Sequence, residues 1–111
     1  MEEAILDSRQ TLGQVLADAR KKRSKSLKEI SLRVKKEDGS SISPQYLNDI
    51  EHDRRTPSPV VLEQLAKAFD LPPDYLYFLA GSMPEDLAKA RGVTEDQIVE
   101  AYKAFRRKLG G

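Results

Sequence analysis

A short segment in the middle of the chain, residues 42–58, combines hydrogen-bonding side chains with a pair of arginines. Ser43 and Pro44 are typical of the cap and the first turn of a helix. Leu47 and Ile50 then point inward at helical spacing, which leaves polar side chains on the outer face. Amide and carboxylate groups can read base edges in a DNA major groove, and guanidinium groups can bind phosphate. The outward residues are Gln45, Asn48 and Asp49, followed by Arg54 and Arg55.

No set of residues in the sequence is typical of a catalytic or metal site. The chain has no cysteine, no phosphate-cradling glycine loop and a single histidine, His52. Although Asp49 and Asp53 flank that histidine, carboxylates beside one helical histidine usually belong to a solvated surface. We therefore predict that the protein is not an enzyme, with no catalytic residue, no metal and no cofactor.

The charge of the chain is unevenly distributed. Residues 20–36 hold nine basic residues and one acidic residue, Glu29, so this segment carries +8 while the remainder carries −7 and the whole chain +1. A block of one sign in a nearly neutral chain indicates a polyanionic partner such as nucleic acid. A solvated basic loop is the alternative reading.

Length and composition predict a small cytoplasmic protein. The 111 residues suit one domain with a short appendage. The lack of cysteine excludes disulfides and favours an intracellular location. No apolar run reaches membrane-spanning length, so no membrane partner is expected.

The sequence predicts an all-α fold, because no segment shows the alternation of a strand. Capping-box pairs open two helices near the start and one near the end, and serine followed by proline opens two more. A further short helix is expected between a proline pair and Gly81. The predicted divisions are an N-terminal segment at 1–10, a domain at 11–82 and a C-terminal helical extension at 83–111. The capping pairs are Thr11 with Gln14, Ser26 with Glu29, and Thr94 with Gln97, and the serine–proline starts are Ser43 and Ser58.

Residues 11–81 resemble the lambda-repressor-like (Cro/CI-type, xenobiotic-response-element) helix-turn-helix family. The resemblance rests on three strings in the right order and spacing: 26–31, 42–51 and 54–58. A fourth match follows over 62–71. The resemblance implies a five-helix fold and sequence-specific binding of double-stranded DNA, with a recognition helix at about 44–53.

The resemblance also implies roles for individual residues. The helix positions that face base edges in this family are occupied here by Pro44, Gln45 and Asp49, with Tyr46 and Asn48 beside them. A glutamine amide can pair with adenine N6 and N7, and a carboxylate can accept from cytosine N4. The phosphate-binding candidates are Arg54, Arg55, Lys28, Lys35, Lys36 and Ser43. An arginine late in the first helix, Arg20, is expected to pair with Glu51 as a structural ion pair.

One departure from the family lies between the second and third helices. The usual turn of about four residues is replaced by a connection from Val34 to Ser43, about six residues longer, whose polar part 35–41 is centred on Gly39. A loop of this length adds little entropic cost. It is either a tolerated insertion, a loop that brings Lys35 and Lys36 to the DNA backbone, or an extension of the second helix.

The C-terminal extension carries an apolar stripe that must be covered by something. Ile98, Tyr102, Phe105 and Leu109 recur at helical spacing. They are expected to pack either on Tyr75 and Phe78 or on another subunit.

The predicted function is that of a small transcriptional regulator, such as a repressor, that occupies promoter DNA. A homodimer would bind a palindromic operator with its recognition helices about 34 Å apart. The alternative is a protein-interaction module of the same fold, such as an antitoxin or a bridging coactivator.

Overall fold

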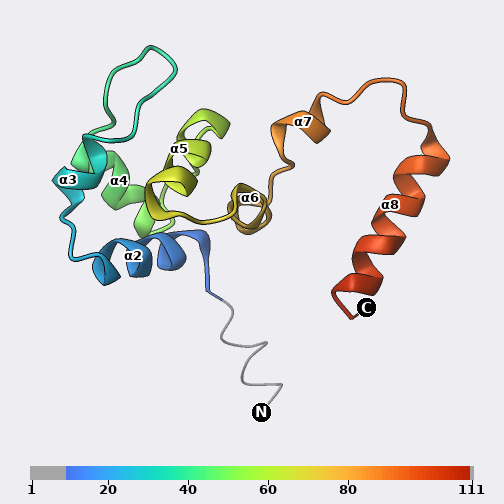
Figure 1. The fold of residues 1–111 in the computed structure, drawn as a ribbon, viewed down its shortest axis with the longest axis horizontal. Helices are drawn as coiled ribbons and strands as arrows, with labels where there is room; N and C mark the ends of the chain where they lie inside the picture. Colours follow the sequence, from blue (N-terminus) through green and yellow to red (C-terminus); the bar gives the residue numbers. More distant parts are fainter. Residues whose placement is uncertain (1–9, 111) are drawn as a thin grey trace.

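The computed structural model describes residues 10–110 and shows an all-helical chain, as predicted (Figure 1). Within this range no helix is both long and apolar enough to cross a membrane. Apart from Gln10, the predicted N-terminal segment lies outside the described residues. The helices are α2 (Leu12–Lys22), α3 (Leu27–Ser31), α4 (Pro44–Glu51), α5 (Pro59–Phe69), α6 (Pro73–Ala80), α7 (Glu85–Ala88) and α8 (Glu95–Lys108).

The helix starts follow local capping chemistry. In α2, α3 and α8 a serine or threonine side chain accepts from the third backbone N–H of the helix, and the Glu or Gln at that position reaches back to the cap. Helices α4 and α5 begin at Ser43 and Ser58, each followed by proline. Because these signals are local, the predicted starts of all five helices are confirmed.

Helices α2 to α6 surround one core. Helix α4 packs on α2 and α3, and α5 packs on α6 and α2. Their inward faces supply aliphatic side chains and one aromatic ring from each of α5 and α6. The fully buried side chains include Leu16, Ile30, Leu47, Ile50, Leu62, Leu65, Phe69, Leu76 and Tyr77.

Tyr77 carries the one phenol of this core. Its hydroxyl donates to Glu63 of α5 at 3.0 Å, so the buried polar group is satisfied. Burial raises the pKa of Tyr77 to about 12, and the neighbouring Glu63 carboxylate adds to the effect. The phenol is therefore neutral across the physiological range and acts as a donor between α5 and α6.

The connection between α3 and α4 is an ordered hairpin, not an extension of the second helix. The helical spacing of Leu27, Ile30 and Val34 predicts that all three lie on the inward face of one helix. This is wrong for Val34, because α3 ends at Ser31, although Val34 is fully buried. The Ile42 N–H donates to the Val34 carbonyl at 2.9 Å, and Lys35 pairs with Ser41 in an antiparallel bridge. Figure 1 shows this loop projecting from the end of the bundle that holds α3 and α4.

Helix α5 fixes the base of that hairpin. The Lys35 backbone N–H donates to Gln64 Oε1 at 2.6 Å, and Gln64 Nε2 donates to the Lys35 carbonyl at 2.9 Å. The Gln64 side-chain amide thus forms the two hydrogen bonds that a neighbouring strand would otherwise form with the backbone N–H and carbonyl of Lys35. The hairpin is therefore held against the helical core by hydrogen bonds to α5.

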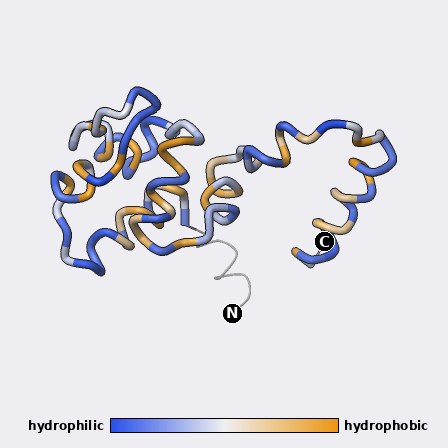
Figure 2. Tube along the Cα trace, turned by 45° about the horizontal axis from the view of Figure 1, so that its top comes forward, coloured by the Kyte–Doolittle hydropathy of each residue, from blue (hydrophilic) through white to orange (hydrophobic). Residues whose placement is uncertain are grey.

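The C-terminal extension departs from the compact bundle. The radius of gyration is 16.0 Å, whereas about 13 Å is typical of a compact domain of this length. Figure 2 shows apolar positions recurring along α8, which is set apart from the bundle. Of the two coverings expected for the stripe, α6 or another subunit, the structure has a contact with α6: Phe78 and Phe105 meet edge to face at 6.1 Å between centroids.

Candidate nucleic-acid interface

Helix α4 presents a polar edge outward from a fixed base. The Ser43 side chain caps the helix by accepting from the Tyr46 N–H at 3.0 Å. Leu47 and Ile50 are fully buried and hold the helix against the core. The outer positions are Pro44 and Gln45, which are exposed, and Tyr46, Asn48 and Asp49, which are half-buried.

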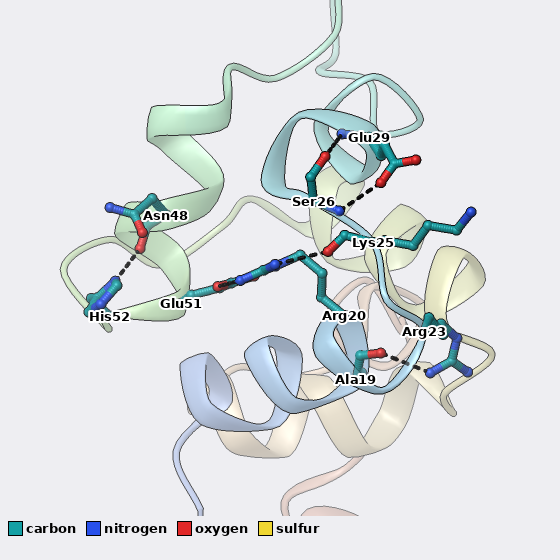
Figure 3. A network of polar contacts seen from close by, with 9 residues as sticks. All are labelled: Ala19, Arg20, Arg23, Lys25, Ser26, Glu29, Asn48, Glu51 and His52. Atoms are coloured by element: carbon teal, nitrogen blue, oxygen red, sulfur yellow. Dashed lines mark hydrogen bonds and ion pairs between the residues drawn. The ribbon is translucent and has the colours of Figure 1, made fainter.

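An ion pair joins α4 to α2 across the core. Arg20 donates from Nε and Nη2 to the two carboxylate oxygens of Glu51, at 2.7 and 2.9 Å (Figure 3). Its Nη1 also donates to the Lys25 carbonyl at 2.9 Å. The Glu51 side chain is only 3% exposed and Arg20 13%, so the pair is largely shielded from water. These hydrogen bonds raise the pKa of the Arg20 guanidinium above its ordinary value.

The outer side of α4 is turned away from this pair. Figure 3 shows Asn48 and His52 on the side opposite Arg20, with the His52 ring nitrogen Nδ1 hydrogen-bonded to the Asn48 carbonyl at 2.9 Å. His52 is exposed and ends the helix as its C-terminal cap. Among residues 10–110, no group of histidine and carboxylate side chains is arranged to hold a metal ion.

A second contact with α2, which the sequence did not predict, is made by Asp53, just after the end of α4. Its carboxylate accepts from the Gly13 N–H at 2.9 Å and from the Thr11 hydroxyl at 2.5 Å. The chain reaches this position by taking a left-handed conformation at Asp53, with φ of +59°. A carboxylate at the start of α2 satisfies a free N–H and complements the helix dipole. Only the positive-φ preference of aspartate hinted at this role in the sequence.

The close approach of the two helices explains the glycine at position 13. A Cβ atom on Gly13 would lie 2.3 Å from the Glu51 carbonyl oxygen and 2.6 Å from that of Ile50. Both of these atoms belong to the backbone of α4, so neither can move aside cheaply. Gly13 therefore sets the distance at which α4 sits on α2.

Three of the predicted DNA-contacting residues are bonded to one another. Asp49 Oδ1 accepts from Gln45 Nε2 at 3.0 Å, from Arg54 Nε at 3.0 Å and from Arg54 Nη2 at 2.8 Å. The Arg54 hydrogen bond holds the pKa of the Asp49 carboxyl below its ordinary value, with a smaller contribution from Gln45. Gln45, Asp49 and Arg54 thus form a single cluster on the edge of α4, which we call the Asp49 cluster.

Arg55 is also positioned by α4. Its guanidinium carbon lies 4.7 Å from the centre of the Tyr46 ring, a cation–π arrangement. Since Tyr46 is in the first turn of α4, this stacking carries the charge of Arg55 back beside the outer face. Arg54 and Arg55 therefore both lie against α4.

The other predicted phosphate contacts come from separate elements. Lys28 is exposed in the first turn of α3, and Lys36 is exposed in the hairpin. The Lys35 ammonium instead donates to Ser41 Oγ at 2.8 Å and to the Leu32 carbonyl at 3.3 Å. Ser43 is exposed, and its hydroxyl oxygen is used in the cap while its hydrogen can still be donated.

Part of the basic block is structural. Besides Arg20, Arg23 donates to the carbonyls of Ala19 and Phe69, at 3.1 and 2.5 Å, and lies over the Phe69 ring. These two arginines tie α2 to the rest of the core. Arg23 is exposed despite these contacts, and the other exposed cations in this segment are Lys21, Lys22, Lys28, Arg33, Lys35 and Lys36.

Comparison with known proteins agrees with this architecture. A family model described as a helix-turn-helix domain matches residues 13–82, which run from α2 through α6. No curated protein and no solved structure matches the chain. Proteins of this kind use a helix held on a second helix to bind DNA, which is the arrangement of α3 and α4 here. With most of its length matched, the chain belongs to the helix-turn-helix domain family.

Proposed function

We propose that the protein is a sequence-specific transcriptional regulator of the lambda-repressor-like (xenobiotic-response-element) type, with α4 in the major groove. The observation that carries this proposal is the Asp49 cluster on the outer edge of α4. It combines an amide that can read a base with a guanidinium beside it. The protein would act by occupying promoter DNA, as a cytoplasmic repressor does, and not by catalysis.

Gln45 is the proposed base reader. One of its two amide N–H groups is donated to Asp49, which fixes the plane of the amide. The second N–H and the carbonyl remain as a donor and an acceptor side by side. That pair matches N7 and N6 of adenine. Asp49 would therefore act mainly through Gln45, with direct acceptance from cytosine N4 as its second role.

The flanking residues of α4 complete the proposed reading edge. Pro44 offers apolar contact to a thymine methyl group, while Tyr46 and Asn48 offer further hydrogen bonds to bases or phosphate.

Cations on three elements are proposed to bind phosphate on either side of this edge. Arg54 and Arg55 follow α4, Lys28 opens α3, and Lys35 and Lys36 belong to the hairpin, with the Ser43 hydroxyl at the groove. Pairing with Arg54 also lowers the repulsion that the Asp49 carboxylate would exert on phosphate.

We further propose that the protein binds as a homodimer to a palindromic operator. Two copies related by a two-fold axis would place their recognition helices about 34 Å apart, one helical turn of DNA. Dimerisation adds the affinity that one short helix lacks.

The test is selection of bound fragments from a pool of random duplex DNA by the full-length protein. We expect enrichment of one motif with two-fold symmetry, and an affinity for it that falls steeply with salt because phosphate contacts release counterions.

A pool that stays random after repeated selection would contradict sequence-specific binding. A DNA affinity that is weak and insensitive to salt would favour the protein-interaction module, an antitoxin or a bridging coactivator, over the regulator.

A further inference from the structure

An apolar face on α6 and α8 has no role in the proposed DNA binding. Three large side chains of α8, Ile98, Tyr102 and Phe105, and that of its C-terminal cap, Leu109, are between 45% and 64% exposed. Phe78 of α6, at 40%, continues the face. Between the two helices lies a cleft of about 560 Å³ whose lining is mainly apolar. Contiguous apolar surface of this kind usually marks a binding site for another molecule.

Helix α8 carries the capping and charge signals of a stable helix, but the rest of the described chain covers little of its surface. Its start has a full capping box at Thr94 and Gln97, and its first and last turns carry the charges that suit the helix dipole. A 14-residue helix is marginally stable alone, so its stability normally comes from packing of its apolar stripe. Within the described chain, Phe105 of α8 forms an aromatic pair with Phe78 of the bundle.

The charges of α8 indicate what covers the stripe. The first half is acidic, with Glu95, Asp96 and Glu100, whereas the second half is basic. Two such helices side by side in the same direction would place like charges together. Side by side in opposite directions, each acidic half would lie beside a basic half, and the two helix dipoles would also be antiparallel. The basic residues are Lys103, Arg106, Arg107 and Lys108.

We propose that the α6–α8 face binds the same face of a second copy of this chain, with the two α8 helices antiparallel. This assigns a surface to the homodimer of the proposed function and rests on that part of it. With the two-fold axis between positions 102 and 105, Tyr102 faces Phe105 of the second copy and Ile98 faces Leu109. All four stripe residues then find an apolar partner, and the open cleft is closed by the second α8.

The first measurement is the solution mass of full-length protein without DNA, across a concentration series. We expect a two-state change from 12.5 kDa to twice that mass. Ile98→Asp should weaken dimerisation by about tenfold or more, because Ile98 lies on the stripe yet does not line the cleft within one chain. Leu32→Asp, at an exposed leucine just after α3, is the matched control and should leave the dimer unchanged.

The second measurement fixes the direction of the helices by disulfide trapping. Because the chain has no cysteine, an introduced one has no competitor. In the antiparallel pair the two copies of residue 98 lie about 16 Å apart, given a rise of 1.5 Å per residue. A disulfide needs Cα atoms within about 7 Å. Ile98→Cys protein should therefore cross-link to Leu109→Cys protein when mixed, and neither should cross-link to itself.

Lys103→Cys is the control for the cross-linking experiment. Residue 103 lies close to the proposed axis but on the polar side of α8, so this variant should not cross-link. A monomer at all concentrations, or an unchanged dimer in Ile98→Asp, would overturn the proposal. Efficient self-cross-linking of Ile98→Cys would show parallel helices and also overturn it. Because these measurements contain no DNA, a negative result would not contradict DNA recognition by α4, which is tested separately.

Discussion

Asp49 determines what the edge of α4 offers to a duplex. A single carboxylate oxygen accepts from both Gln45 and Arg54, which fixes the amide and turns the guanidinium toward α4. The same contacts explain why an acidic residue is compatible with a phosphate-rich surface. We therefore expect Asp49 to favour discrimination between sequences over total affinity.

Asp49→Ala should change affinity and specificity in opposite directions. Removing the carboxylate releases Arg54 to phosphate and frees Gln45 to rotate. We expect binding to random duplex DNA to rise by about threefold to tenfold and to become more salt-dependent by about one unit of slope. Preference for the selected site should fall by about tenfold. Titrations at several salt concentrations on both DNAs measure these changes.

Asp86→Ala is the matched control for that variant, since it removes one exposed carboxylate from α7. If both variants shift random and selected DNA equally, the effect of Asp49 is only its net charge.

Residue pairs were predictable to different degrees. The Arg20–Glu51 pair was expected because the resemblance places those residue types at those positions. The contact of Gln45 with Asp49 has the i, i+4 spacing of helix neighbours, although its role was not predicted. The Asp53 contact to α2 joins residues 40 positions apart, and no local pattern encodes it.

Among the helices and loops, features set by neighbouring residues were predicted, whereas features set by residues far along the chain were not. Helix starts were predicted correctly because caps lie within four residues of the side chains they serve. The loop at 35–41 was also predicted, but its hairpin pairing was not, because that depends on Gln64, 29 residues after Lys35. The distance between α2 and α4 was not predicted either. It depends on the lack of a side chain at Gly13, and the periodicity of apolar residues does not show where two helices approach closely.

Gly13→Ala should destabilise the domain even though alanine favours a helix. The added Cβ would meet α4 backbone atoms, so the helices must separate and the core must shift. We expect a loss of about 3 kcal/mol in the free energy of unfolding, measured by urea denaturation. DNA affinity should also fall, because α4 is displaced.

Gly39→Ala separates steric contact from backbone strain. Its φ is +87° and a Cβ there meets nothing within 4 Å, so only the cost of a left-handed conformation applies, about 1 kcal/mol. A Gly13→Ala protein no less stable than Gly39→Ala would show that α2 and α4 are not in close contact.

At the scale of the whole molecule, the protein divides its surfaces between two tasks. The edge of α4, with its arginines, is the proposed DNA-binding surface, and the α6–α8 face is the proposed surface for a second copy. Sequence periodicity predicted the apolar stripe of α8 correctly. It left two partners open because a period shows which side of a helix is apolar and not what covers it. The exposed fractions of the stripe and the ring contact of Phe78 with Phe105 support the proposal that a second copy covers it.

The central claim is that Gln45 reads a base from α4, and one measurement tests it most directly. Wild-type and Gln45→Ala proteins are titrated against the selected site, single base-pair variants of that site and random duplex DNA. Gln45→Ala should cost about 1–3 kcal/mol on the selected site, with preference lost at one base pair in each half-site and random-DNA affinity unchanged. Equal loss on all of these DNAs would contradict direct reading of bases by α4.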